Sequence, residues 1–354
     1  MDLDFVPLDV MCARVWPGAR YEVTSMPGGA STRRYFRVEL EAGHSAVGMF
    51  VPDGPKPEEI QKNHGGSRWP FLEVRDLLAE HGVDVPALYA EDTANGWLLI
   101  EDLGEDTLAN YLARRRAEQA ALYTCAGRDL ARAQRRLTAL PEGSVVMGRC
   151  FDEDLLRWEI EHFREWGLDA RGKSLPAAQR ARFDDIAVRL ARRISALERG
   201  FTHRDYQSRN LMVRMPPRSP DRSHGLVWID FQDALLGPRV YDLVALLNDS
   251  YQTFDRAFVE ARLADYAEEA GLGEGSRENL LFEFDLVTVQ RKLKDAGRFV
   301  FIDRQKGNPS FLKFVVPTIA KVGTALGRLS DRDPDMAELR SILEGAVGDE
   351  LRAG

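Results

Sequence analysis

The 354-residue sequence has only three cysteines, Cys12, Cys125 and Cys150, which are far apart and never form a Cys-x-x-Cys pair. Neither a disulfide framework nor a zinc site is therefore indicated. Lysine and arginine (48) are fewer than aspartate and glutamate (56), and the net charge of −8 argues against a protein that coats nucleic acid. Arginine, aspartate or glutamate interrupts every apolar run, so none approaches the ~20 apolar residues of a membrane span.

The beginning of the chain, MDLDFVPLDV, lacks the basic and then apolar layout of a signal peptide. Hydrophobic residues make up 44% and charged residues 29% of the sequence, values typical of a soluble globular protein. We therefore expect a cytoplasmic monomer with no nucleic-acid or membrane partner. The length suggests two domains or two lobes.

The first part of the chain has the pattern of short strands. Residues 21–26, 34–40, 45–51, 85–89 and 96–100 are the strand candidates. Residues 71–81 have apolar side chains at helical spacing, and Gly82 closes that segment. Amphipathic helical patterns dominate the rest. The sequence predicts an α+β fold, with a small five-stranded antiparallel lobe and one main helix at residues 1–103 and a larger, mostly helical lobe at residues 104–354.

One segment without helical periodicity lies between the helices of the second part. Its apolar runs at 211–213 and 226–229 are joined by a loop rich in Pro, Ser and Asp, which predicts a β-hairpin. Asn210 precedes the first strand and Asp230 follows the second, so their oxygens meet at one end of the hairpin and suit Mg²⁺. Asp205, five residues before Asn210, is available to orient a hydroxyl. The alternative is that these are ordinary turn residues.

Three segments of this region, HRDYQSRNLM, WIDFQDA and YDLVALL, resemble the aminoglycoside phosphotransferase and choline kinase superfamily in order and spacing. That superfamily has the bilobal protein-kinase-like fold. Within it, STRRYFRV, IEDLGEDTL and FDEDLLRWEIEHFREW are most similar to the bacterial cell-wall-recycling kinases that phosphorylate the anomeric hydroxyl of N-acetylmuramate or N-acetylglucosamine. The resemblance implies ATP and Mg²⁺ as cofactors and a small amino sugar as substrate.

The kinase pattern gives the residues of the hairpin distinct roles. It implies that Asp205 accepts the substrate proton, and that Asn210 and Asp230 hold Mg²⁺. It also implies that backbone groups of Glu101 and Leu103 bind adenine. The expected phosphate contacts are Gly28, Gly29, Ser31, Thr32 and Arg33. A Gly-Gly turn alone is more often a plain hairpin than a nucleotide-binding loop; its position upstream of the HRD segment is what favours the nucleotide.

The sequence departs from the kinase pattern at one position. Kinases carry a lysine on the third strand of the small lobe, but SAVGMFV has Gly48 or Met49 at that place. Arg33, Arg34 or Lys62 are the candidates to replace its charge. A nucleotide-binding pseudokinase with a regulatory role is therefore one alternative, although the retention of Asp205, Asn210 and Asp230 together argues against it.

The acceptor is indicated by a local excess of positive charge. Residues 281–313 contain seven basic and four acidic side chains, and Arg291, Lys294 and Arg298 share one helical face. This surface favours a substrate with a carboxylate, such as the lactyl group of N-acetylmuramate, over a cationic aminoglycoside or amino alcohol, which is the other alternative. A solvated basic face explains the pattern equally well. Further candidates for sugar contacts are Arg157, Glu159 and Gln290. We expect His203 to brace the loop and Asp242 to anchor it.

Overall fold

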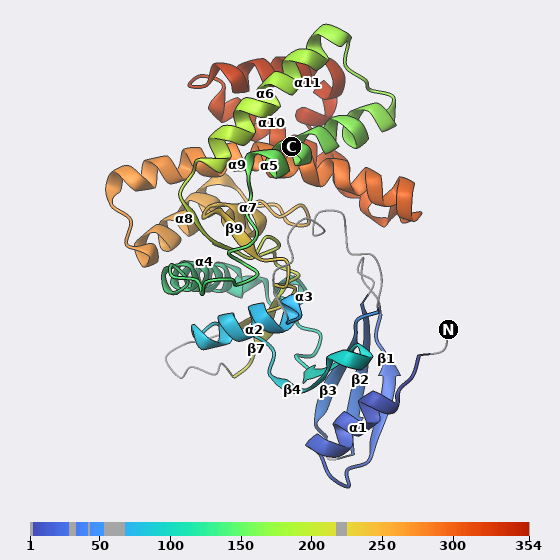
Figure 1. Cartoon of the computed structure of the whole chain (residues 1–354). Helices are drawn as coiled ribbons and strands as arrows, with labels where there is room; N and C mark the ends of the chain where they lie inside the picture. Colours follow the sequence, from blue (N-terminus) through green and yellow to red (C-terminus); the bar gives the residue numbers. More distant parts are fainter. Residues whose placement is uncertain (1–2, 28–32, 42, 53–67, 217–224, 354) are drawn as a thin grey trace. The chain divides into compact units, whose positions relative to one another are not determined.

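The computed structural model describes residues 3–27, 33–41, 43–52, 68–216 and 225–353. Five residues considered above, Gly28, Gly29, Ser31, Thr32 and Lys62, lie outside the described residues. The chain divides into two compact units, one of residues 1–114 and 209–232, and one of residues 115–208 and 233–354 (Figure 1). The functional lobes expected at residues 1–103 and 104–354 stay a prediction.

An antiparallel sheet with strand order β1-β2-β3-β5-β4 forms the centre of the first unit, and it confirms the predicted five-stranded fold. Its strands are β1 (Tyr21–Ser25), β2 (Arg34–Leu40), β3 (Ser45–Phe50), β4 (Leu88–Asp92) and β5 (Trp97–Glu101). Four of them lie close to their predicted positions. The remaining strand, β4, begins three residues later than predicted, because Pro86 has no backbone N–H group to donate to a neighbouring strand.

Helix α1 (Val6–Val15) covers one face of this sheet, and the sequence did not indicate it. Leu8, Met11 and Cys12 pack there against buried side chains of β2, β3 and β5. Burial raises the pKa of the Cys12 thiol to about 11, so this cysteine stays neutral. Gly48 faces the same core. A Cβ atom on it would come 3.0 Å from Leu8 and 3.4 Å from the Trp97 ring.

Helix α2 (Pro70–Glu80) follows the predicted pattern, with proline in its first turn and its apolar side chains buried. Helix α3 (Leu108–Arg114) and the hairpin of β7 (Leu211–Arg214) and β8 (Gly225–Trp228) complete this unit. The ring of Phe71 in α2 stacks on that of Phe231 with centroids 5.1 Å apart. The backbone N–H of Trp228 donates to the carbonyl of Asp84 at 2.8 Å. These contacts join the hairpin to residues more than a hundred positions earlier.

The second unit is mostly helical, as predicted. Its main helices are α4 (Gln119–Arg136), α5 (Glu153–His162), α6 (Ala177–Ser195), α7 (Tyr241–Leu247), α8 (Arg256–Ala270), α9 (Glu274–Lys306), α10 (Val315–Leu329) and α11 (Pro334–Leu351). Strand β6 (Arg199–Thr202) pairs with β9 (Leu235–Pro238). Asp255 caps α8 by accepting the N–H of Phe258 at 2.7 Å, and Gly271, with a φ of +71°, ends that helix.

The long helix α9 packs against α5 and against the π-helical turn that follows it, η4 (Phe163–Leu168). The backbones approach closely at Gly297. A Cβ atom on this glycine would come 2.9 Å from the carbonyl oxygen of His162 and from the Cα of Phe163. This distance is below normal contact, so a glycine is required at the crossing.

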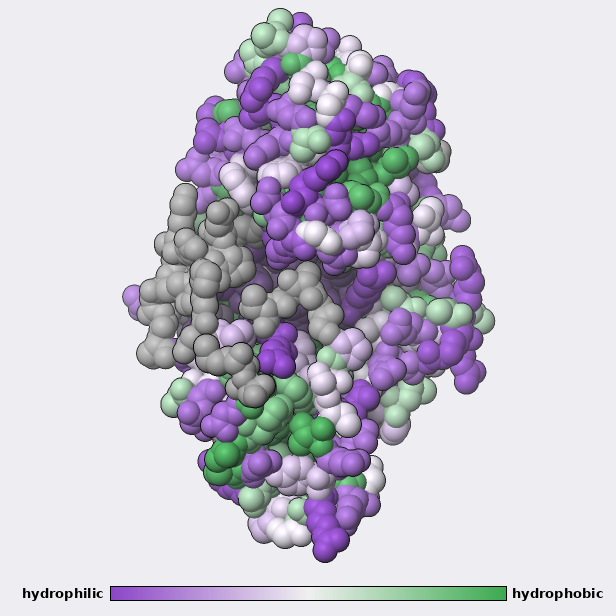
Figure 2. Space-filling model, turned by 90° about the vertical axis from the view of Figure 1, so that its right-hand side faces the viewer, coloured by the Kyte–Doolittle hydropathy of each residue, from purple (hydrophilic) through white to green (hydrophobic). Residues whose placement is uncertain are grey.

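Hydrophilic side chains predominate on the face shown in Figure 2, and the apolar ones there form small separate areas. None of the helices in the described ranges combines the length and apolar character that crossing a bilayer requires.

The close crossing at Gly297 leads to a stability prediction. We expect Gly297→Ala to lower the free energy of unfolding by about 1–3 kcal/mol, because the added methyl group forces the two helix backbones apart. Denaturant titration measures this change. The control is Gly275→Ala in the same helix, where a Cβ atom meets nothing within 4 Å. Equal stability of the two variants would contradict the account of the crossing.

Candidate active site

The segment of residues 203–208, called here the 203–208 loop, follows β6 and is anchored from α7. The buried carboxylate of Asp242 accepts the backbone N–H groups of His203 at 2.6 Å and of Arg204 at 3.0 Å. Arg204 has a φ of +79°, a left-handed conformation that is uncommon outside glycine. These bonds hold the loop in a strained turn, and they confirm the anchoring role predicted for Asp242.

The remaining contacts of the loop are also with buried groups. The backbone N–H of Asp205 donates to Nδ1 of the fully buried His203 at 3.3 Å, which agrees with the bracing role expected for that ring. The hydroxyl of Tyr206 donates to the carbonyl of Ala126 at 2.9 Å. Ser208 donates to the carboxylate of Asp249 at 2.7 Å. The loop is therefore fixed along most of its length.

The carboxylate of Asp205 faces several cations. It lies 3.3 Å from Nη2 of Arg291 and is 38% exposed. Burial by itself would raise the pKa of Asp205, but the charges of Arg291, Lys294 and Arg204 outweigh it and hold the pKa below the usual value. The side chain is consequently ionised at neutral pH and partly open to solvent.

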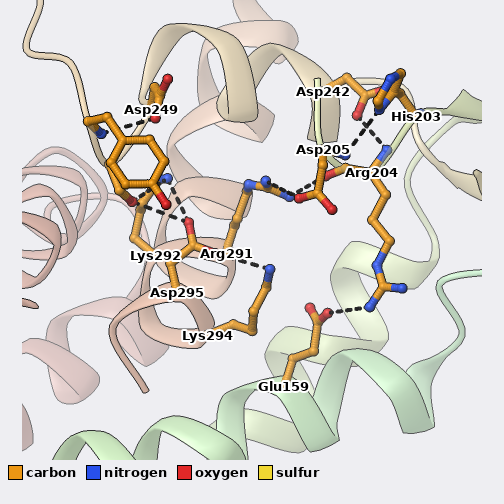
Figure 3. Close-up of polar contacts among 12 residues, drawn as sticks. Glu159, His203, Arg204, Asp205, Asp242, Asp249, Arg291, Lys292, Lys294 and Asp295 are labelled. Atoms are coloured by element: carbon orange, nitrogen blue, oxygen red, sulfur yellow. Dashed lines mark hydrogen bonds and ion pairs between the residues drawn. The ribbon is translucent and has the colours of Figure 1, made fainter. Parts of the chain in front are cut away.

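A polar cluster lies beside Asp205 in the second unit. Nε2 of Gln290 donates to the Glu159 carboxylate at 2.6 Å, and Nη2 of Arg204 lies 3.9 Å from the same group. Figure 3 shows the side chains of Glu159, Arg204, Asp205 and Lys294 pointing toward one another from α5, the 203–208 loop and α9. Glu159 is 1% exposed. The structure thus brings together three of the predicted sugar-contact residues, namely Glu159, Gln290 and Lys294.

Asp295 fixes Lys294 in this cluster. Its carboxylate lies 3.0 Å from Nζ of Lys294 and 2.8 Å from Nζ of the buried Lys292 (Figure 3). Burial disfavours the charged form of Lys294, but Asp295 outweighs this effect and raises the pKa of the ammonium above its usual value. Lys294 is therefore a fixed positive charge.

Two other predicted sugar contacts are placed differently. Arg157 is 44% exposed and forms ion pairs within α5, with Asp154 at 3.8 Å and Glu161 at 3.6 Å. The structure does not bring it into the polar cluster. Arg291 is 2% exposed and donates to the 203–208 loop, so the solvated basic face that the sequence allowed does not describe this residue.

The expected metal-binding end of the hairpin lies in the first unit. Strands β7 and β8 pair as predicted, and the N–H of Ile229 donates to the carbonyl of Asn210 at 3.0 Å. Asn210 and Asp230 therefore lie at the same end. Asp230 has a φ of +63° and a 46% exposed side chain, which accepts from Nε2 of Gln232 at 3.0 Å.

These two residues fit Mg²⁺. A carboxylate and an amide supply the hard oxygen ligands that this ion prefers, and it is commonly bound by few protein groups together with phosphate oxygens and water. Within the part of the chain that the structure describes, no group of three or more His, Cys, Asp and Glu side chains could hold a metal.

The expected adenine-binding segment is held by charged side chains. The carboxylate of Glu101 accepts from Nη2 of Arg214 at 2.6 Å and from the backbone N–H of Ala87 at 3.0 Å. Asp102 accepts from Nε of Arg37 at 2.8 Å and from the N–H of Gly104 at 2.9 Å. These bonds fix the backbone on both sides of Leu103. The side chain of Glu101 is bonded to Arg214 and Ala87, so it has a structural role.

The structure shows how the two residues at the place of the third-strand lysine are packed. Gly48 faces the α1 core, and Met49 is buried on the other face. Of the expected phosphate contacts only Arg33 lies in the described residues, and its Nη1 is 3.5 Å from Asp230. Arg33 is one of the three candidates to replace the charge of the missing lysine. Its guanidinium lies close to Asp230, the predicted metal ligand.

Sequence reasoning missed Arg204 as a member of the polar cluster. Its position next to Asp205 in the HRD segment was the available signal. The partner of Lys294, Asp295, was also missed, although it directly follows Lys294 in the sequence.

Comparisons with known proteins agree with this geometry. Residues 22–277 match the model of the phosphotransferase enzyme family. An N-acetylmuramate/N-acetylglucosamine kinase of Pseudomonas putida is 34% identical over 94% of this chain and 89% of its own length. The kinase of the same name from Pseudomonas aeruginosa is 35% identical over 91% and 88%. Among solved structures, Plasmodium vivax ethanolamine kinase has the same fold, with a TM-score of 0.55 and 12% identity over 87% of this chain and 82% of that chain.

The family model covers more than two thirds of the chain, and the relatives match nearly all of it. The family segments include the 203–208 loop, the hairpin and α7, whose arrangement is described above. The chain belongs to the phosphotransferase enzyme family.

Proposed function

We propose that this phosphotransferase transfers the γ-phosphoryl group of ATP to the anomeric hydroxyl of N-acetylmuramate, N-acetylglucosamine or both, in the recycling of peptidoglycan. The relatives that match most of the chain are named for these two sugars. The observation that carries the proposal is the ionised carboxylate of Asp205, which stands beside a cluster with two cations and a carboxylate.

In the proposed reaction, the hydroxyl oxygen of the sugar attacks the γ-phosphorus of ATP. Asp205 receives the proton of that hydroxyl, and ADP leaves. An anomeric hydroxyl is more acidic than an ordinary alcohol, so a carboxylate within hydrogen-bond reach is an adequate base. Asn210 and Asp230 would hold Mg²⁺, which neutralises charge on the phosphates. Backbone groups of Glu101 and Leu103 would bind adenine. The phosphate contacts would be Gly28, Gly29, Ser31, Thr32 and Arg33.

The acceptor site we propose is the polar cluster beside Asp205. The ammonium of Lys294 is the group that suits the lactyl carboxylate of N-acetylmuramate. Glu159 and Gln290 are almost fully buried and bonded to each other, so they would have to exchange that bond for bonds to sugar hydroxyls. Three cations, those of Arg204, Arg291 and Lys294, act on the Asp205 carboxylate. A polycationic aminoglycoside would be repelled by them, which favours the sugar over that alternative.

The first prediction concerns the proposed base. We expect Asp205→Asn to lower kcat at least about 100-fold, because the amide cannot accept the proton, while the affinity for ATP stays within about twofold. ADP release with each sugar measures the rate. Asp349→Asn, at a fully exposed position, is the matched control. Unchanged turnover in Asp205→Asn would remove this residue from the mechanism.

A second prediction concerns the choice between the two sugars. We expect Lys294→Met to raise KM for N-acetylmuramate about tenfold, the effect of losing roughly 1.4 kcal/mol of charge-assisted binding. The KM for N-acetylglucosamine, which has no carboxylate, should change far less. Arg304→Met, at a 59% exposed position of the same helix, controls for loss of charge. If both sugars lose affinity equally, Lys294 does not recognise the carboxylate.

A further inference from the structure

We propose that Arg291 is a positioning residue, whose guanidinium fixes the backbone and the carboxylate of Asp205 together in the geometry needed to accept the substrate proton. The inference rests on the proposed role of Asp205. It assigns Arg291 to the support of the base and not to direct contact with the sugar.

The guanidinium uses two nitrogens for two parts of the loop. Nη1 donates to the carbonyl of Arg204 at 2.7 Å. This carbonyl belongs to the peptide bond between Arg204 and Asp205. Nη2 lies 3.3 Å from Oδ1 of Asp205 itself. One rigid planar group thus sets the distance between the backbone and the side chain of the same residue. A lysine ammonium, a single point on a flexible stem, is not matched to this pair of acceptors.

The bond to the Arg204 carbonyl acts at the strained point of the loop. Arg204 has a φ of +79°, and a conformation of this kind costs about 1–3 kcal/mol unless its surroundings impose it. Asp242 accepts the N–H of Arg204 from α7, and Arg291 donates to its carbonyl from α9. Both backbone groups of the strained residue are therefore held by buried side chains from two different helices (Figure 3).

Arg291 is itself held in place. It is 2% exposed, and its guanidinium carbon lies 4.6 Å from the centre of the buried Tyr241 ring. A cation buried to this degree is costly unless it is paired. It donates hydrogen bonds to the Arg204 carbonyl and to the Asp205 carboxylate. A substrate carboxylate would have to displace them, which favours a positioning role over a binding role.

The charge of Arg291 has a second, separable effect. The charged and titratable groups that act on Asp205 are Arg291 and Lys294 from α9, Arg204 and His203 from the loop and, with the opposite sign, Asp242 from α7. Removing Arg291 removes the largest of the influences that lower the pKa of Asp205, so that pKa rises. The carboxylate is then protonated at higher pH, and the acid limb of kcat/KM moves upward.

The experiment compares Arg291→Met and Arg291→Lys with the wild-type enzyme, using ATP and either sugar. We expect Arg291→Met to lower kcat about 100-fold, the effect of a misplaced base, with both KM values within about threefold. Its acid limb should move to higher pH. Arg291→Lys retains the positive charge but not the planar guanidinium that bonds both acceptors. We therefore expect kcat to fall about tenfold or more, while the acid limb stays near that of the wild type. Arg304→Met should change neither.

Several results would overturn the proposal. An unchanged kcat in Arg291→Met would do so, and so would an acid limb that does not move. A loss confined to KM for N-acetylmuramate would make Arg291 a substrate contact. If Arg291→Met does not fold, Arg291→Lys alone decides. A kcat equal to that of the wild type in Arg291→Lys would show that the two-pronged guanidinium is not needed.

A direct titration separates this inference from the proposed function. If the wild-type enzyme phosphorylates neither sugar, the proposed function fails. The Asp205 carboxyl can then still be followed by ¹³C NMR against pH, with its signal assigned by Asp205→Asn. A higher pKa in Arg291→Met than in the wild type supports the positioning contact. Equal pKa values in the two proteins refute it.

Discussion

The loop that carries Asp205 depends on two buried polar groups, the carboxyl of Asp242 and the guanidinium of Arg291, which hold one residue. Asp242 accepts the N–H of Arg204, and Arg291 donates to the carbonyl of the same residue. Arg204 can remain in its left-handed conformation because both of its backbone groups are engaged in this way. The position of Asp205 follows directly, since the next peptide begins at that carbonyl. Helices α7 and α9 matter to the chemistry because they supply these two side chains.

The cations around Asp205 underlie the proposed choice of acceptor. A carboxylate surrounded by fixed cations stays ionised, and the cations would repel a polycationic acceptor. Lys294 owes its place and its charge to Asp295, which also binds Lys292. Glu159 balances Arg204 and orients Gln290. The cations of the cluster thus have carboxylate partners, and they still lie close enough to Asp205 to lower its pKa. The net charge of −8 gives no indication of this local arrangement.

Much of the fold could be predicted because the local signals were strong. The hairpin of β7 and β8 was indicated by two apolar runs around a polar loop, and α2 by its apolar spacing and terminal glycine. The helix α1 was missed, since its exposed face carries Val6 and Val10, which blur the amphipathic pattern. The spacing of Arg291 and Lys294 placed them on one helical face. It could not indicate that Arg291 points into the protein, because that depends on how α9 packs against α7 and the 203–208 loop.

The most direct test of the account is a crystal structure with N-acetylmuramate and a non-hydrolysable ATP analogue bound. The account predicts the anomeric oxygen within about 2.6–3.2 Å of the Asp205 carboxylate, the lactyl carboxylate at Lys294, and Arg291 still bonded to the Arg204 carbonyl. An anomeric oxygen out of reach of Asp205, or an Arg291 guanidinium turned to the sugar carboxylate, would contradict it.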